Sequence, residues 1–187
     1  MLYSTVTPAD KRAAFRARLA TGELIRMPGA FNPLSAKLIQ DKGFEGVYIS
    51  GAVLSADLGL PDIGLTTLTE VASRGQQISR MTDLPTLIDA DTGFGEPMNV
   101  ARTIQTLEDA GLAGCHIEDQ VNPKRCGHLD GKAVEYLQRQ NEYTFFENTH
   151  EPYTLKGARF PGVWSSLVRM PLPRVLESYD PVLAGRS

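Results

Sequence analysis

The sequence has few of the residues on which several protein classes depend. Its 187 residues include 2 cysteines, 1 tryptophan and 3 histidines. Two thiols cannot build the disulfide framework of a small secreted domain, so we expect free thiols in a reducing compartment. No apolar run approaches the roughly 18 residues of a membrane span. The start, MLYSTVTPADKR, has no apolar signal-peptide core, which predicts an intracellular, cytoplasmic protein without a membrane partner.

Blocks of like charge are also missing. The chain carries 19 Lys and Arg against 22 Asp and Glu, for a net charge of -3. Proteins that bind polyanions usually carry a basic patch or stripe, and none is visible here. The charge pattern therefore argues against nucleic acid as a partner.

The first two thirds of the chain alternate short β-branched runs with helical periods. This alternation is typical of βα units and a parallel sheet, so the fold class is α/β. We expect an initial helix over 8–22, anchored by Phe15 and Leu19, and a helix after PGAFNP with Leu34 and Leu38 on its apolar face. Expected strands cover 24–27, 47–50, 85–90 and 113–118, and further helices follow a long loop over 50–67 and the DTGFGEP turn.

The remaining residues have a different composition. Residues 135–187 hold 8 of the 14 aromatic residues and 5 of the 12 prolines but 3 of the 17 glycines. The closely spaced prolines are incompatible with long helices. We therefore predict a partial (β/α) barrel over 1–134 and an irregular tail over 135–187.

Two aspartates mark the end of the strand expected over 85–90. Asp89 and Asp91, in LIDADTGFG, are one residue apart and share one side of an extended chain. Adjacent carboxylates repel each other, and a hard divalent cation relieves that repulsion. The sequence predicts Mg²⁺, with Mn²⁺ as a substitute, bound directly or through water. The alternative is a helix cap at one aspartate and a solvated side chain at the other.

The next strand repeats this pattern in CHIEDQ. Glu118 ends the strand and is placed to support a metal at Asp91, whereas His116 fits a hydrogen-bonded core histidine and Cys115 fits packing. Asp62, Tyr48 and Ser50 are weaker candidates, because turn chemistry or core packing also explains them.

A polar loop follows, NPKRCGHLDGK. Cys126 lies among Lys124, Arg125 and His128. Cationic neighbours stabilise a thiolate, so Cys126 has the setting of a reactive thiol. An incidental cysteine in a solvated basic loop is the alternative.

These motifs together resemble the 2-methylisocitrate lyases of the isocitrate lyase and phosphoenolpyruvate mutase superfamily. The resemblance covers about residues 3–133 and rests on KRCGH, IDADTGFG, HIEDQ, PGAFNPLSAKLIQ and YISGAVLSADLGLPDIG. The phosphonopyruvate-processing branch lacks the KRCGH cysteine. Isocitrate lyases usually have tryptophan after the Ser-Gly pair, where this chain has Ala52 and many methylisocitrate lyases have glycine.

The resemblance implies the N-terminal half of a (β/α)₈ TIM-type barrel and Mg²⁺-dependent cleavage of a small tricarboxylate into pyruvate and succinate, in propionate breakdown. It also implies a homotetramer. By matching positions it assigns the metal to Asp89, Asp91, Asp62 and Glu118, substrate contacts to Ser50, Gly51, Ala52, Gly127 and His128, and catalysis to Cys126 as general acid, Lys124 as its tuning cation and Tyr48 as one candidate base.

The resemblance ends near Val134. The arginines and other groups with which the family grips its substrate in later strands have no match in 135–187, and four βα units are half a barrel. We expect an unpaired sheet edge after the fourth strand. Three interpretations stay open: a methylisocitrate lyase, a catalytically dead half-barrel that binds only metal or partner subunits, and an isocitrate lyase.

Overall fold

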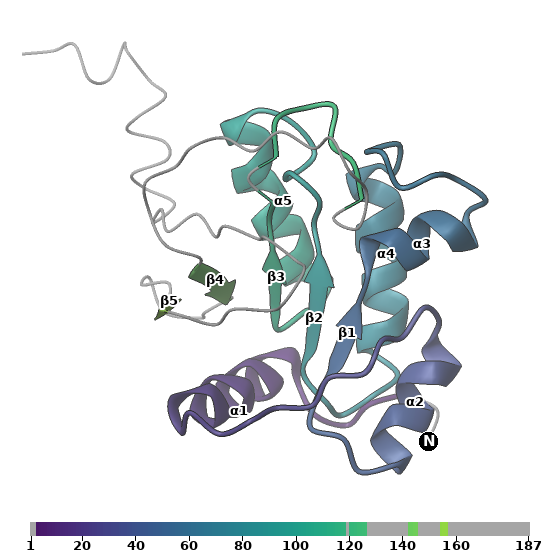
Figure 1. Ribbon diagram of the computed structural model, residues 1–187. Coiled ribbons are helices and arrows are strands. Elements are labelled where there is room, and N and C mark those ends of the chain that lie inside the picture. Colours follow the sequence, from purple (N-terminus) through teal and green to yellow (C-terminus); the bar gives the residue numbers. More distant parts are fainter. Residues whose placement is uncertain (1–2, 119, 127–141, 146–153, 157–187) are drawn as a thin grey trace, which may run out of the picture.

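The sheet at the centre of the molecule is built from short strands. The computed structural model describes residues 3–118, 120–126, 142–145 and 154–156. Strands β1 (Val47–Ile49), β2 (Thr86–Asp89) and β3 (Gly114–His116) are parallel neighbours. Strands β4 (Glu142–Phe145) and β5 (Thr154–Lys156) continue the sheet in antiparallel orientation, in the order β1-β2-β3-β4-β5 (Figure 1).

The described residues contain five helices, which lie beside or at the ends of the parallel strands (Figure 1). They are α1 (Pro8–Ala20), α2 (Pro33–Asp41), α3 (Gly51–Asp57), α4 (Leu68–Ser79) and α5 (Pro97–Asp109). Capping boxes at Asn32 and Thr67 begin α2 and α4, because each side chain accepts a hydrogen bond from the N3 backbone. In Figure 1, α4 and α5 lie along the parallel strands and α1 lies at their amino-terminal end. None of the described helices is long and apolar enough to cross a membrane.

The core lies between the parallel strands and these helices. Its largest fully buried side chains include Ile49, Ile78, Ile88, Leu107 and Leu112. Each buried side chain of this size stabilises the fold by about 1.5–3 kcal/mol. This packing fixes the carboxyl ends of β1, β2 and β3 in one row.

Most of the expected elements are confirmed. Helix α4 buries Val71, Ala72, Gly75 and Ile78, as its periodicity predicts. Phe15 is buried with Leu19 packed against the same small cluster, so the anchors of α1 are confirmed. The helix closed by Gly111 is α5, and Gly111 has the positive φ of a helix-terminating glycine.

The first expected strand is wrong. Residues 24–27 form no strand, and the chain pairs with β1 only through a bridge between Gly29 and Tyr48. Pro28 lacks a backbone N–H, which limits ladder pairing. Arg26 instead donates to the Glu45 carboxylate.

The apolar face expected for α2 is also wrong. Leu34 and Leu38 are 73% and 56% exposed, whereas Ala36 and Ile39 are buried. The helix packs on α4, and its buried residues are Ala36 and Ile39. Contacts between the two helices therefore decide which face of α2 is buried, and the i, i+4 spacing of the leucines does not. The loop expected over 50–67 contains the short helix α3.

The tail differs from expectation in one respect. Strand β4 pairs antiparallel with β3, so this edge of the sheet is covered rather than open, and two short strands replace part of the expected irregular chain. The rest of 135–187 lies outside the described residues.

Candidate active site

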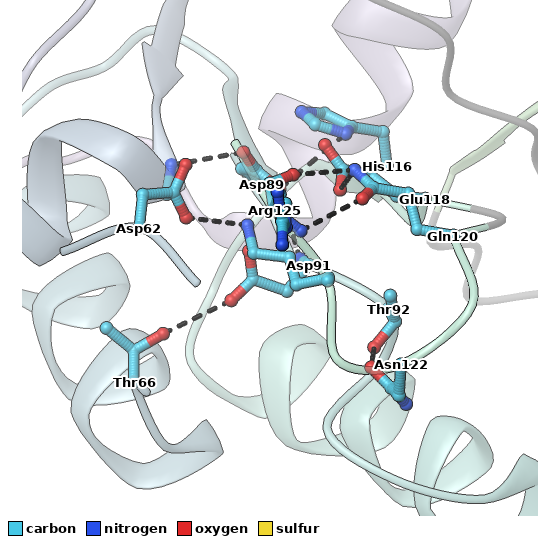
Figure 2. Close-up of polar contacts among 12 residues, drawn as sticks. Asp62, Thr66, Asp89, Asp91, Thr92, His116, Glu118, Gln120, Asn122 and Arg125 are labelled. Carbon is cyan, nitrogen blue, oxygen red and sulfur yellow. Dashed lines mark hydrogen bonds and ion pairs between the residues drawn. The ribbon is translucent and has the colours of Figure 1, made fainter. Parts of the chain in front are cut away.

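Acidic side chains gather where the parallel strands end. Asp89 is the last residue of β2, Asp91 follows it, and Glu118 follows β3. Asp62 reaches the same place from the loop between α3 and α4 (Figure 2). Because parallel strands present their carboxyl ends at one edge, residues far apart in sequence meet here.

Two backbone N–H groups hold the Asp89 carboxylate. The Gly51 N–H donates to Asp89 Oδ2 at 3.2 Å, and the Asp91 N–H donates to Asp89 Oδ1 at 3.0 Å. A Cβ at residue 51 would lie 2.9 Å from Asp89 Oδ2. Glycine at this position therefore lets the carboxylate lie against the backbone.

Lys124 is the buried cation of the cluster. Its side chain is 2% exposed, and Nζ contacts Asp62 Oδ1 at 2.6 Å and also Asp91 Oδ1. Burial alone would lower the pKa of Lys124, but its hydrogen bonds to both aspartates outweigh burial and raise it. The ammonium therefore stays charged at neutral pH.

The pKa values of Asp91 and Glu118 are both raised above their ordinary values. Burial and the Asp89 charge raise the pKa of Asp91, although Lys124 opposes that shift. Burial, followed by the Asp89 charge, raises the pKa of Glu118 to about 7. The Gln120 amide donates to Glu118 Oε2 at 2.6 Å and holds this carboxyl group in place.

The Glu118 shift predicts a pH-dependent stability. The folded protein holds a proton on Glu118 that the unfolded chain releases near the ordinary pKa of 4.5, so stability falls from about pH 4.5 to pH 7 and then levels off. Glu118→Gln should remove this contribution and flatten the Tm profile measured without divalent cations. An equally steep decline in Glu118→Gln would contradict the assignment. The exposed Glu96 gives a matched control in Glu96→Gln.

Tyr48 and His116 form a contact that the sequence did not predict. The Tyr48 hydroxyl lies 2.6 Å from His116 Nε2, and the rings stack with centroids 5.6 Å apart. His116 Nδ1 is buried without a hydrogen-bond partner, 3.8 Å from Asp89 Oδ1. His116 is a buried histidine, as expected, but it also touches the candidate base.

Cys126 lies beside the cluster. Its backbone N–H donates to the Asp62 carbonyl at 3.0 Å, while the Arg125 N–H donates to Gln120 Oε1 at 3.0 Å. Cys126 is partly exposed. Cys115 is fully buried in β3, and burial, with the Asp89 charge second, raises the pKa of its thiol to about 12.

The two thiols should therefore differ in reactivity. We expect iodoacetamide at neutral pH to label Cys126 well before Cys115, because the thiolate fraction and access both favour Cys126. Peptide mapping by mass spectrometry gives the two rates in one sample. Earlier labelling of Cys115 would reverse the assignment of the reactive thiol.

A cavity opens next to the acidic cluster. Its volume is about 670 Å³, and it lies between the loop before α4 and the start of α5. Of the candidate site residues, Asp91 and Lys124 line it, together with polar groups that include Thr66, Asn99 and Arg102. Small polar molecules therefore have access to one side of the cluster.

The donor set suits a hard cation. Four carboxylates gather here (Figure 2), two of them paired with the Lys124 ammonium, and oxygen-only ligands favour Mg²⁺. Within the described ranges, no three His, Cys, Asp or Glu side chains already form a metal-binding group. Fewer than three of the described carboxylates therefore converge on one point, and the remaining ligands of a cation would be water or substrate.

Other predicted residues have varied outcomes. Ser50 and Ala52 flank Gly51 at the start of α3 and are partly exposed. Gly127 and His128 lie outside the described residues. Sequence reasoning did not assign Gln120 or Thr66, whose hydroxyl donates to Asp91 Oδ2 at 3.2 Å. Gln120 lies two residues beyond Glu118, and this spacing places both side chains on the same side of an extended chain. The spacing could therefore have indicated their contact.

Comparison with known proteins assigns more than half of the chain to one family, while a second family model matches its last part. The family model "Phosphoenolpyruvate phosphomutase" matches residues 15–145, and "MucB/RseB N-terminal domain" matches residues 113–187. A Corynebacterium glutamicum protein named probable 2-methylisocitrate lyase 2 is 72% identical over 134 residues, which are 72% of this chain and 44% of that protein. The chain thus spans less than half the length of this relative.

Solved structures agree with the sequence comparison. A 2,3-dimethylmalate lyase, described as a member of the PEP mutase/isocitrate lyase superfamily, has a TM-score of 0.64 and 38% identity, over 71% of this chain and 44% of that one. A phosphonopyruvate hydrolase complex with oxalate and Mg²⁺ has a TM-score of 0.59 and 35% identity, over 65% of this chain and 43% of that one. The parallel strands of the described residues and their helices form part of a TIM-type barrel.

Proposed function

Because this chain belongs to the phosphoenolpyruvate phosphomutase family, we propose that it carries the metal- and thiol-bearing half of a lyase that cleaves 2-methylisocitrate to pyruvate and succinate. The observation that carries the proposal is the meeting of Asp62, Asp89, Asp91 and Glu118 with the Cys126 segment (Figure 2). Over 134 residues, the chain is 72% identical to a probable 2-methylisocitrate lyase.

Asp89 and Asp91 would hold Mg²⁺, supported by Asp62 and Glu118. When bound, Mg²⁺ would stabilise the negative charge that develops on the pyruvate fragment. Mn²⁺ has the same preference for oxygen ligands and should substitute. Lys124 pairs with Asp62, and the Gly51 N–H holds the Asp89 carboxylate in place.

Cleavage also needs two proton transfers. The substrate hydroxyl loses a proton as its C–O bond becomes the pyruvate carbonyl, the carbon–carbon bond breaks, and the electron pair goes to the succinate carbon. Tyr48, in contact with His116, is the candidate base. Cys126 would donate the proton that the succinate carbon needs.

The substrate contacts proposed at Ser50, Gly51, Ala52, Gly127 and His128 complete one side of the site. Several further cations should hold the three substrate carboxylates, and the family supplies them from later strands. A homotetramer, a cytoplasmic location and a domain boundary near Val134 stay predictions. The boundary lies inside the segment that both family models match.

A catalytically dead half-barrel is the second candidate. It is favoured by the sheet, in which β3 pairs with an antiparallel strand rather than a further parallel strand. A pyruvate-release assay on the purified 187-residue chain, after size-exclusion chromatography, separates the two interpretations by residual activity: slow, Mg²⁺-dependent release favours the lyase half, and no release favours the dead half-barrel.

We expect that chain alone to be slower than a complete barrel by about 100-fold or more, because the substrate is poorly oriented and exposed to water. A monodisperse preparation that releases pyruvate at a full rate, and stops in Cys126→Ser, would contradict this expectation. It would show that the chain is a complete enzyme.

A further inference from the structure

The position of Lys124 suggests a role beyond catalysis. Its ammonium lies between the carboxylates of Asp62 and Asp91 and is almost fully buried. Figure 2 shows Asp62, Asp89, Asp91 and Glu118 close together. In the part of the chain that the structure describes, Lys124 is the cation in direct contact with two of these four carboxylates.

An ammonium and a divalent cation compete for the same oxygens. Mg²⁺ binds carboxylate oxygen at about 2.0–2.1 Å in a strict octahedral geometry. Asp91 Oδ1 already contacts Lys124 Nζ, and Asp91 Oδ2 accepts from Thr66. A cation that takes Asp91 Oδ1 must therefore compete with Lys124 for this oxygen.

Movement of Lys124 would also affect Cys126. Three contacts join the segment 120–126 to the acidic cluster. Lys124 forms an ion pair with Asp62, the Cys126 N–H donates to the Asp62 carbonyl, and the Gln120 amide donates to Glu118. Gln120 also donates to the Arg125 carbonyl at 2.9 Å, which ties the two ends of the segment together. The cation site and the thiol therefore share one set of contacts.

We propose that Lys124 is the internal counter-ion of this site: it holds the carboxylates together without metal, and a divalent cation displaces it from Asp91 and loosens the segment that carries Cys126. The proposal rests on the metal site of the proposed function and adds a regulation to it. Loading of the cation and exposure of the thiol are then one coupled event.

The first test is the affinity for Mg²⁺, measured by calorimetry on the full chain. Lys124→Met keeps much of the side-chain volume but removes the competing charge, so binding should tighten about tenfold, within the usual range of coupling between sites. The control is Lys42→Met, at an exposed lysine after α2, which should change affinity less than twofold. Equal affinities in Lys124→Met and wild type would overturn the proposal.

The second test separates displacement from simple charge attraction, and its main comparison uses the wild type alone. The rate of Cys126 alkylation is measured with and without Mg²⁺, with the buried Cys115 as internal reference. In the wild type, Mg²⁺ should raise the rate several-fold, whereas in Lys124→Met the rate should hardly respond. An unchanged or lower wild-type rate with Mg²⁺ would overturn the proposal even if Lys124→Met does not fold.

The outcomes distinguish this proposal from the proposed function. Equal Mg²⁺ affinity in Lys124→Met and wild type overturns the role of Lys124 alone. Absence of Mg²⁺ binding in both overturns that role together with the metal step of the lyase. A completed barrel can show the tighter Mg²⁺ binding of Lys124→Met and the Mg²⁺-dependent alkylation of Cys126 but release no pyruvate. That result overturns the proposed lyase activity and leaves the role of Lys124 intact.

Discussion

Asp91→Asn should weaken Mg²⁺ binding at least tenfold, or about 1.4 kcal/mol. The substitution removes one charged oxygen ligand from the acidic cluster. Asn suits the position because Asp91 has a φ of 48°, a conformation that asparagine adopts more readily than most residues. Burial first, and repulsion from Asp89 second, raise the pKa of Asp91. A neutral asparagine relieves both, so the fold should persist.

Calorimetric titration of the wild type and Asp91→Asn measures this effect. Asp109→Asn is the matched control, because it makes the same charge change at an exposed residue that ends α5. Circular dichroism checks that each variant is folded. The same Mg²⁺ affinity in Asp91→Asn and wild type would place the metal elsewhere.

Cys126→Ser should lower turnover by about 10²–10⁴-fold, the usual contribution of a positioned general acid or base. The measurement needs a complete barrel. A chimaera of residues 1–133 with the following part of the Corynebacterium glutamicum relative provides one, since that relative is 72% identical over 134 residues.

The Mg²⁺ affinity of the Cys126→Ser chimaera should stay within twofold of its parent, because the thiol is not among the carboxylate ligands. Cys115→Ser is the control, although it places a hydroxyl in the core and also requires a stability check. Full turnover in Cys126→Ser would assign the proton donor to another group.

Local patterns predicted the parts of the fold that depend on neighbours in sequence. The buried face of α4 follows from helical period, and the meeting of Asp89 with Glu118 follows from strands that end at one edge. The exposed leucines of α2 could not be predicted in this way, because the packing of α2 on α4 selects the buried face. Antiparallel pairing of β4 with β3 is likewise a long-range choice.

The site shows the same division. The types of residue and their order predicted the acidic cluster. The contact between Tyr48 and His116 depends on the parallel register, which places Tyr48 opposite Leu87 and His116 opposite Asp89. The burial of Lys124 between Asp62 and Asp91 depends on the path of 120–126, and sequence spacing alone gave that lysine a role beside Cys126 instead.

The most direct measurement of the central claim is pyruvate release from 2-methylisocitrate by the chimaera in the presence of Mg²⁺. The account predicts pyruvate and succinate in equal amounts, with activity lost when the metal is chelated and restored by Mg²⁺ or Mn²⁺. A folded chimaera that binds Mg²⁺ but releases no pyruvate, or one that cleaves only isocitrate, would contradict it.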